Sequence, residues 1–166
     1  MVALAVLAAG GLTLELARFR VAWLNQRLLR WLWLVLKEQE ERRITGATYM
    51  LIGAFLAFLF FDAGVAVAAL LFLSLGDPAA ALVGRRMPGL RLSGKSPGGT
   101  VAFVAVALLV VAVLTASGVV EYHWALLAGA AVAGLVELLP LPPDDNLTIP
   151  LASGAAMHFI PLASGA

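Results

Sequence analysis

The chain has 166 residues, of which 62% are hydrophobic and 13% charged, and its mean hydropathy is +0.98. A soluble domain of this size needs more charge to cover its surface, so the composition excludes the soluble classes. It predicts an all-α, polytopic membrane protein made of one integral membrane domain, residues 1–166. The sequence has no cysteine, which excludes disulfides and thiolate metal sites.

Six segments are apolar enough to be membrane spans, for which roughly 20 residues are needed. In chain order they are 1–17, 44–61, 63–84, 99–118, 124–139 and about 147–165. The segment 21–36 differs from them because arginines and tryptophans interrupt it, a pattern typical of an interfacial helix. We therefore expect about six transmembrane helices and one interfacial helix.

The basic residues are unevenly distributed along the chain. All eleven lysines and arginines lie in two segments, 18–43 and 85–95. With six spans, both segments and the connection 140–146 fall on one side of the membrane, and the positive-inside rule predicts that this side is the cytoplasm. We expect an integral protein of the plasma membrane, or of the inner membrane in a prokaryote. The acidic residues that lie toward the same side are Glu15, Asp77 and Glu137.

The first polar segment, "KEQEERRITGATY", precedes the second span. Arg42 and Arg43 are candidates for binding phosphates or lipid head groups, and Glu40 or Glu41 for supporting them. The alternative is a solvated charged face that has no ligand.

The third span contains "LGDPAAALVGRR". Glycine and proline weaken a helix, so we expect it to be interrupted at Gly76-Asp77-Pro78. An ionisable side chain inside a span is costly and usually functional, although an aspartate before a proline is also a common helix start. Arg85 and Arg86 follow at the surface, as phosphate partners or as topology markers.

The connection before the fourth span reads "GLRLSGKSPGGT". Gly89, Gly94, Lys95 and Ser96 fit the phosphate-loop pattern G-x-x-x-x-G-K-[ST], but that loop acts between a buried strand and a helix. No strand–helix–strand unit is predicted here, so the P-loop fold is excluded. A phosphate can still be bound by Lys95 together with the N-terminus of the following helix. The alternative is a solvated basic loop that only sets the topology.

The last connection, "PPDDNLTIP", supplies hard oxygen donors. Asp144, Asp145 and Asn146 suit Mg²⁺ that is held together with substrate phosphates. Asp145 or Asn146 is also a candidate N-cap for the sixth helix. Acidic metal ligands and basic phosphate ligands on one membrane face indicate Mg²⁺-dependent phosphoryl or nucleotidyl transfer to a lipid.

The ordered set "ERRITGATYMLIG", "GDPAAALVGRR", "GKSPGGT" and "ELLPLPPDDNLTIPL" resembles the dolichol kinase, phytol kinase and CTP-dependent diacylglycerol kinase family. The resemblance covers roughly 38–152. It implies an all-helical membrane kinase that transfers the γ-phosphate of CTP to a membrane lipid alcohol with Mg²⁺ as cofactor. The expected partners are CTP and the lipid alcohol, without nucleic acid. The family's usual upstream helix with an Arg-Lys…His element has no counterpart in these 166 residues.

Carried over residue by residue, the resemblance implies roles for the same polar positions. The catalytic residues would be Asp77 and Asp145. The metal ligands would be Asp77, Asp144, Asp145 and Asn146. The nucleotide and phosphate ligands would be Arg85, Lys95 and Ser96, and the basic and glycine-rich segments themselves add the candidates Arg43, Arg86 and Gly94. Glu41 and Glu137 also fall on motif positions, without an evident role.

Two other classes of function stay open at this stage. Phosphatidate cytidylyltransferases share the GD motif and a loop like "KSPGGT", but their Pro-Gly-His-Gly-Gly signature has no match here. A membrane transporter or assembly factor is the non-enzymatic alternative, although no charge lies at mid-membrane. The small residues of "AGAAVAG", 128–134, allow helix association, including a homodimer.

Overall fold

A computed structural model describes residues 1–21, 23, 25, 27, 43–87, 91–92, 94–139 and 141–164. The interfacial helix predicted over 21–36 lies mostly outside these residues. Glu40, Glu41, Arg42 and Gly89, which the sequence singled out, also lie outside them.

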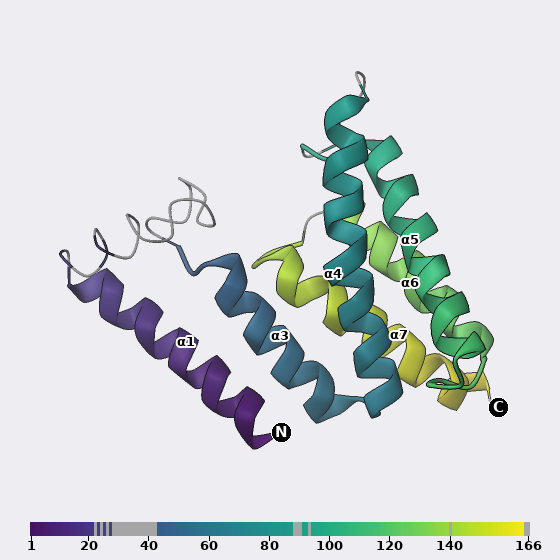
Figure 1. Ribbon diagram of the computed structural model, residues 1–166, viewed down its shortest axis with the longest axis horizontal. Helices are drawn as coiled ribbons and strands as arrows, with labels where there is room; N and C mark the ends of the chain where they lie inside the picture. Colours follow the sequence, from purple (N-terminus) through teal and green to yellow (C-terminus); the bar gives the residue numbers. More distant parts are fainter. Residues whose placement is uncertain are drawn as a thin grey trace.

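Every element of the described residues is a helix (Figure 1), which confirms the all-α class for this part of the chain. The helices are α1 (Val2–Arg20), α3 (Gly46–Phe60), α4 (Ala63–Arg86), α5 (Pro97–Ala116), α6 (Trp124–Leu138) and α7 (Asp145–Ser164). Each corresponds in position to one of the six apolar segments of the sequence.

Three of these helices, α1, α4 and α5, are long and apolar enough to cross a membrane, which indicates a membrane protein. The helices α3 and α6 are apolar but have 15 residues each. At about 1.5 Å per residue, such a helix is shorter than the roughly 30 Å hydrocarbon core of a bilayer. The described residues thus supply three candidate spans, and the count of six stays a prediction.

The interruption predicted at Gly76-Asp77-Pro78 is wrong, because α4 runs unbroken through it with Pro78 inside the helix. Membrane helices tolerate an internal proline where neighbouring helices and side chains compensate the lost backbone hydrogen bond. Gly76 has a packing role instead of a breaking one. A Cβ atom at this position would lie 2.8 Å from the ring of Phe103 in α5.

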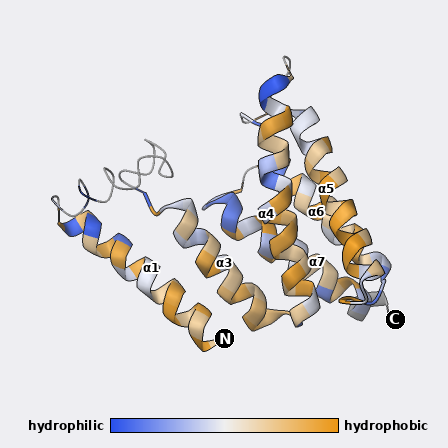
Figure 2. Ribbon diagram, in the orientation of Figure 1, coloured by the Kyte–Doolittle hydropathy of each residue, from blue (hydrophilic) through white to orange (hydrophobic). Residues whose placement is uncertain are grey.

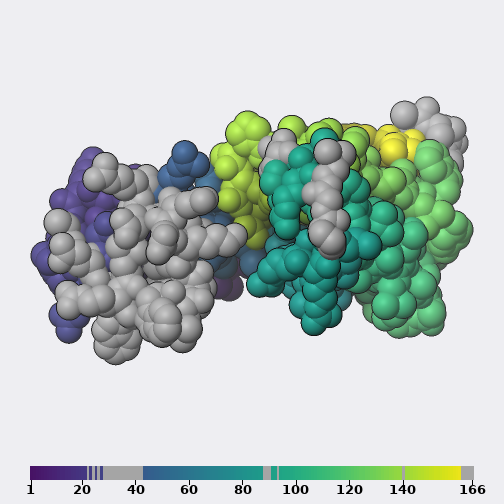
Figure 3. Space-filling view, turned by 90° about the horizontal axis from the view of Figure 1, so that it is seen from above, coloured from purple at the N-terminus to yellow at the C-terminus, as the bar shows by residue number. Residues whose placement is uncertain are grey.

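The core lies between α4, α5, α6 and α7. The helix α4 packs mainly on α5, α6 packs mainly on α7, and α3 joins them through α7. Phe72, Phe103 and Ile149 are fully buried, and small residues fill the remaining contacts and let the helices approach closely. The helix α1 packs on α3, so α1 and α5 lie at opposite ends of the molecule when it is seen from above (Figure 3).

The small residues of 128–134 pack inside the chain. A Cβ atom on Gly129 would meet Met157 of α7 at 2.3 Å, and one on Gly134 would meet Val104 of α5 at 2.3 Å. The sequence predicted that this face allows helix association, and in the structure part of it associates within the monomer.

Hydrophilic segments gather at corresponding ends of three helices (Figure 2). They are the C-terminal ends of α1 and α4 and the N-terminal end of α7, which all lie toward the upper side of the view. The ends of these three helices therefore lie at one end of the helix bundle, where the candidate site is found.

Candidate functional site

The site is organised around a tight turn that precedes α5. Leu92 and Lys95 exchange two backbone hydrogen bonds, of 2.8 and 2.9 Å, and thereby close the turn. Gly94 lies inside it with φ at +88°, a conformation that side chains with a Cβ atom rarely adopt. The Arg91 guanidinium donates to the Gly94 carbonyl at 3.2 Å. The turn fixes the backbone of Lys95 and leaves its side chain to reach the helices.

The Lys95 ammonium is the centre of a cluster of three carboxylates from three different helices. Its Nζ atom lies 2.8 Å from Asp145 at the start of α7, 3.4 Å from Glu137 near the end of α6, and 3.7 Å from Asp77 in α4. We call Lys95, Asp77, Glu137 and Asp145 the Lys95 cluster. The sequence predicted that Asp77 and Asp145 share a site, and the structure brings them to one ammonium group even though α4 is not interrupted.

The carboxylates keep Lys95 charged. Burial by itself lowers the pKa of Lys95, but the hydrogen bond and charge of Asp145, followed by the charges of Glu137 and Asp77, outweigh it and raise the pKa. With three acids around one ammonium, the cluster carries more negative than positive charge. It can therefore accept further positive charge.

Glu137 is the buried member of the cluster. Its side chain is 2% exposed, compared with 22% for Asp145 and 44% for Asp77. The Thr100 hydroxyl, one turn into α5, donates to Glu137 Oε2 at 2.7 Å, while the other oxygen of Glu137 faces Lys95. Glu137 therefore links α6 to α5 as well as to the turn.

Ser96 caps the helix that follows the turn. Its hydroxyl accepts a hydrogen bond from the Gly99 amide at 3.0 Å, and Pro97 takes the first helical position. Ser96 and Gly99 pack directly against Gly84 and Ala80 of α4. The predicted phosphate ligand Ser96 is thus engaged as an N-cap and holds the start of α5 against α4.

A cavity of about 280 Å³ opens beside the Lys95 cluster. Its polar lining combines the acidic side chains of Asp77 and Glu137, the basic side chains of Arg85, Arg91 and Lys95, and the hydroxyl of Ser96. The Arg85 guanidinium donates to the Ala81 carbonyl one turn earlier at 3.1 Å. Arg86, predicted with Arg85, is exposed and does not belong to this lining. Basic side chains beside a helix N-terminus are suited to bind an anion such as a phosphate.

The two adjacent aspartates at the start of α7 have different partners. Asp144 accepts hydrogen bonds from the main-chain and side-chain nitrogens of Asn146, at 2.9 and 2.7 Å, and so caps α7. The predicted cap, Asp145 or Asn146, is therefore wrong by one or two residues. Asp145 points instead to Lys95. The four predicted metal ligands are consequently divided between a helix cap and the Lys95 cluster.

Mg²⁺ fits this donor set only in part. Within the described chain, no group of three acidic, histidine or cysteine side chains is arranged to hold a metal ion by itself. Yet Asp77 and Asp145 approach one cation, the Lys95 ammonium, and Mg²⁺ usually needs only one or two carboxylates when phosphates complete its shell. These two residues would hold the ion together with a phosphate ligand.

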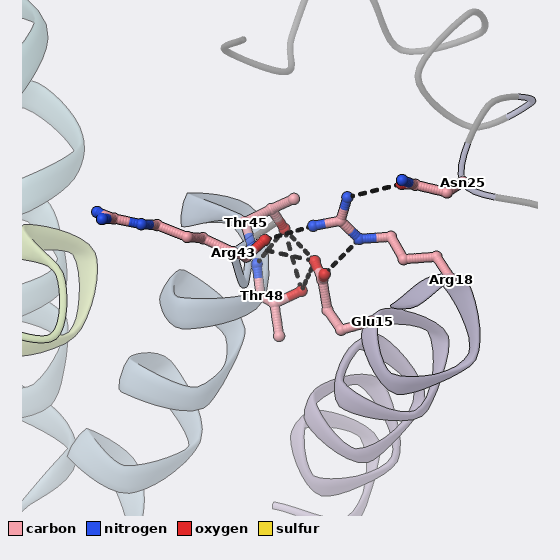
Figure 4. A network of polar contacts seen from close by, with 6 residues as sticks. All are labelled: Glu15, Arg18, Asn25, Arg43, Thr45 and Thr48. Atoms are coloured by element: carbon pink, nitrogen blue, oxygen red, sulfur yellow. Dashed lines mark hydrogen bonds and ion pairs between the residues drawn. The ribbon is translucent and has the colours of Figure 1, made fainter. Parts of the chain in front are cut away.

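A second polar cluster joins α1 to α3 (Figure 4). The Glu15 carboxylate accepts from the Thr45 amide and hydroxyl at 3.1 and 2.7 Å, and from the Thr48 hydroxyl at 3.1 Å. Arg18 donates to Glu15, to Asn25 and to the Arg43 carbonyl. We call Glu15, Arg18, Thr45 and Thr48 the Glu15 cluster. Arg43 contributes its backbone here, and its exposed side chain points away from the cluster.

Arg18, Arg91 and Thr100 were not singled out from the sequence, and Glu15 was only placed toward the cytoplasmic side. Arg91 lies in the basic segment 85–95, so the charge pattern contained a signal for it. Glu15 and Arg18 have opposite charges three residues apart near the end of an apolar helix, which also indicates a pair. Thr100 left no such signal, because its partner Glu137 belongs to a different helix.

The described residues form an all-helical protein with three helices long and apolar enough to cross a membrane, and with a basic, carboxylate-lined cavity beside the start of α5. Comparisons with models of protein families, with curated proteins and with solved structures find no match for this chain.

Proposed function

We propose that this chain is a CTP-dependent lipid kinase that transfers the γ-phosphate of CTP to the hydroxyl of a membrane lipid alcohol, such as a polyprenol, phytol or diacylglycerol. The observation that carries the proposal is the contact of Asp77 and Asp145 with the Lys95 ammonium beside a basic cavity. The motifs that resemble the kinase family, which are far apart in the sequence, supply these residues.

The basic residues would bind the triphosphate. Lys95, Arg85 and Arg91 line the cavity, and α5 begins beside them with its N-terminus. Their charges would neutralise the phosphates, since phosphoryl transfer depends mainly on positioning and on electrostatic stabilisation of the transferred group.

The accessible carboxylates would act on the acceptor. In the transfer, the lipid hydroxyl oxygen forms a bond to the γ-phosphorus, and the bond from that phosphorus to the β-phosphate oxygen breaks and releases CDP. Asp77 or Asp145 would orient the hydroxyl and take up its proton. Mg²⁺ held by these two residues would supply positive charge to the phosphates. The position of Asp145 at the start of α7 suits a lipid alcohol that arrives from the bilayer interface.

We infer that the polar end of the bundle faces the cytoplasm. Both basic segments of the sequence, 18–43 and 85–95, adjoin helix ends on this side (Figure 2). The positive-inside rule assigns such an end to the cytoplasmic side of the membrane.

An assay with differently labelled CTP tests the proposal. The purified protein is incubated with Mg²⁺, with each lipid alcohol or with phosphatidate, and with CTP labelled in the α- or the γ-phosphate. Transfer of the γ-label to a lipid alcohol is the expected result. Incorporation of the α-label into lipid would identify a CDP-lipid synthase instead. If neither label reaches lipid, the kinase proposal is wrong, and a transport or assembly role gains support.

A further inference from the structure

The three carboxylates of the Lys95 cluster differ in how firmly they are held. Glu137 is almost fully buried and receives a hydrogen bond from Thr100, whereas Asp77 is 44% exposed and lies at the longest distance, 3.7 Å, from Lys95. A side chain that is buried and hydrogen-bonded has few alternative positions. Glu137 is therefore the fixed partner of Lys95, and Asp77 is the accessible one.

The burial of Glu137 calls for a reason beyond stability. A buried carboxylate destabilises the folded state unless it is paired, and even a paired one often contributes no more stability than an apolar side chain of the same size. Lys95 has a flexible four-carbon side chain that ends in a compact charge, and it extends from a turn rather than from a helix. It needs a fixed counter-charge to hold its ammonium at one place in the cavity.

We propose that Glu137 is a positioning residue that, held by Thr100, fixes the Lys95 ammonium where the cavity receives a phosphate ligand. In the absence of Mg²⁺, Asp77 has the opposite relation to that ligand, because its accessible negative charge lines the same cavity and repels an anion. The identity of the ligand as CTP rests on the proposed function, whereas the positioning of Lys95 does not.

Amine modification reports how accessible the Lys95 amine is, and therefore how firmly it is held. The chain contains only two lysines, Lys37 and Lys95, so Lys37 is an internal standard within every sample. The detergent-solubilised protein is treated with formaldehyde and a borane reductant at fixed pH, and mass spectrometry follows methylation of each lysine. We compare the wild type with Glu137→Gln, Thr100→Val and the control Glu121→Gln, an exposed position in the turn before α6.

Releasing Lys95 should accelerate its methylation. We expect the ratio of Lys95 to Lys37 rates to rise at least about threefold in Glu137→Gln, because a flexible lysine side chain that loses its fixed counter-charge is no longer held in the cluster and reaches the reagent more often. Thr100→Val should give a smaller rise in the same direction, and Glu121→Gln none. An unchanged ratio in folded Glu137→Gln protein overturns the proposal. If that variant does not fold, Thr100→Val decides by the same criterion.

A phosphate probe separates positioning from charge alone. In buffer without Mg²⁺, inorganic tripolyphosphate should protect Lys95 from methylation in the wild type, and the half-protecting concentration reports its affinity. If only net charge mattered, loss of either carboxylate would strengthen anion binding. We expect Asp77→Asn to lower the half-protecting concentration and Glu137→Gln to raise it by about fivefold or more, a loss typical of one misplaced charged partner. A lower concentration in both variants contradicts the positioning role.

These results do not depend on the reaction. If the wild type transfers no phosphate from CTP, the proposed kinase function fails while the methylation ratios still decide the role of Glu137. If transfer is found, Glu137→Gln should raise KM for CTP through Lys95, so its effect should largely disappear in a Lys95→Ala background.

Discussion

The Lys95 cluster and the Glu15 cluster use similar side chains in different ways. Glu15 has one guanidinium and two threonines around it, and its hydrogen bonds come from three residues of the same chain. Lys95 instead faces three carboxylates and borders a cavity. A balanced and saturated network is suited to join helices, whereas an unbalanced one beside a cavity is suited to receive a ligand. Substitutions in each cluster can test this contrast.

The largest effect is expected from Lys95→Ala. The substitution removes the cation at the centre of the Lys95 cluster and leaves three carboxylates to repel one another. We expect transfer from CTP to fall by at least about 100-fold, as when a single charge-stabilising group is removed from an active site. Steady-state transfer of the γ-label measures the change. Arg20→Ala, which removes an exposed cation at the end of α1, serves as the control and should keep most of the activity.

The matched experiment in the other cluster is Glu15→Ala. Loss of this carboxylate deprives Arg18, Thr45 and Thr48 of a shared partner at a buried position. We expect the free energy of unfolding to fall by about 3 kcal/mol, the loss typical of a broken buried pair. Thermal unfolding followed by tryptophan fluorescence measures it, with the exposed Thr13→Ala in the same helix as control. Folded Glu15→Ala protein should keep its transfer rate. A loss of transfer as large as that of Lys95→Ala would contradict a purely structural role of the Glu15 cluster.

The positions of the helices could be predicted from the sequence because apolar runs and turn residues are local signals. Three residues of the Lys95 cluster, Asp77, Lys95 and Asp145, could also be predicted as site residues, since each is a charged residue within or next to an apolar segment. The partner of each side chain could not be predicted. Whether Asp144 or Asp145 caps α7 depends on where Lys95 lies in space, and the choice of Thr100 for Glu137 depends on how α5 and α6 pack.

The break predicted in α4 shows the same limit. Glycine next to Asp-Pro is a local signal for the end of a helix, because glycine and proline have the least favourable helix propensities. In the structure, tertiary contacts decide otherwise, because the missing Cβ of Gly76 makes room for Phe103. Burial of an aromatic ring against a backbone is a property of the assembled helices and is not visible in a single segment.

A smaller effect is expected from Gly84→Ala, which tests how the start of α5 is placed. A Cβ atom at Gly84 would lie 2.7 Å from the Ser96 hydroxyl, so it must displace the cap that precedes the cavity. We expect a loss of about 2 kcal/mol in unfolding free energy, typical of overpacking, and a raised KM for CTP. Gly10→Ala is the control, because nothing lies within 4 Å of the added Cβ atom there. Equal effects of the two variants would show that the contact of α4 with Ser96 does not shape the site.

The smallest effect is expected from Ser96→Ala, and it sharpens the division between structural and ligand-binding groups within the site itself. The Ser96 hydroxyl accepts from the Gly99 amide, so its loss removes an N-cap, which contributes about 1 kcal/mol to stability. If capping is its whole role, Ser96→Thr keeps both stability and transfer, and Ser96→Ala lowers transfer only slightly. If instead the hydroxyl binds phosphate, Ser96→Ala should reduce transfer by more than about tenfold, because a hydrogen bond to a charged group is stronger than a neutral one. Comparing the melting temperature with the transfer rate of both variants distinguishes these roles, since a cap acts on the folded fraction and a ligand contact acts on KM for CTP.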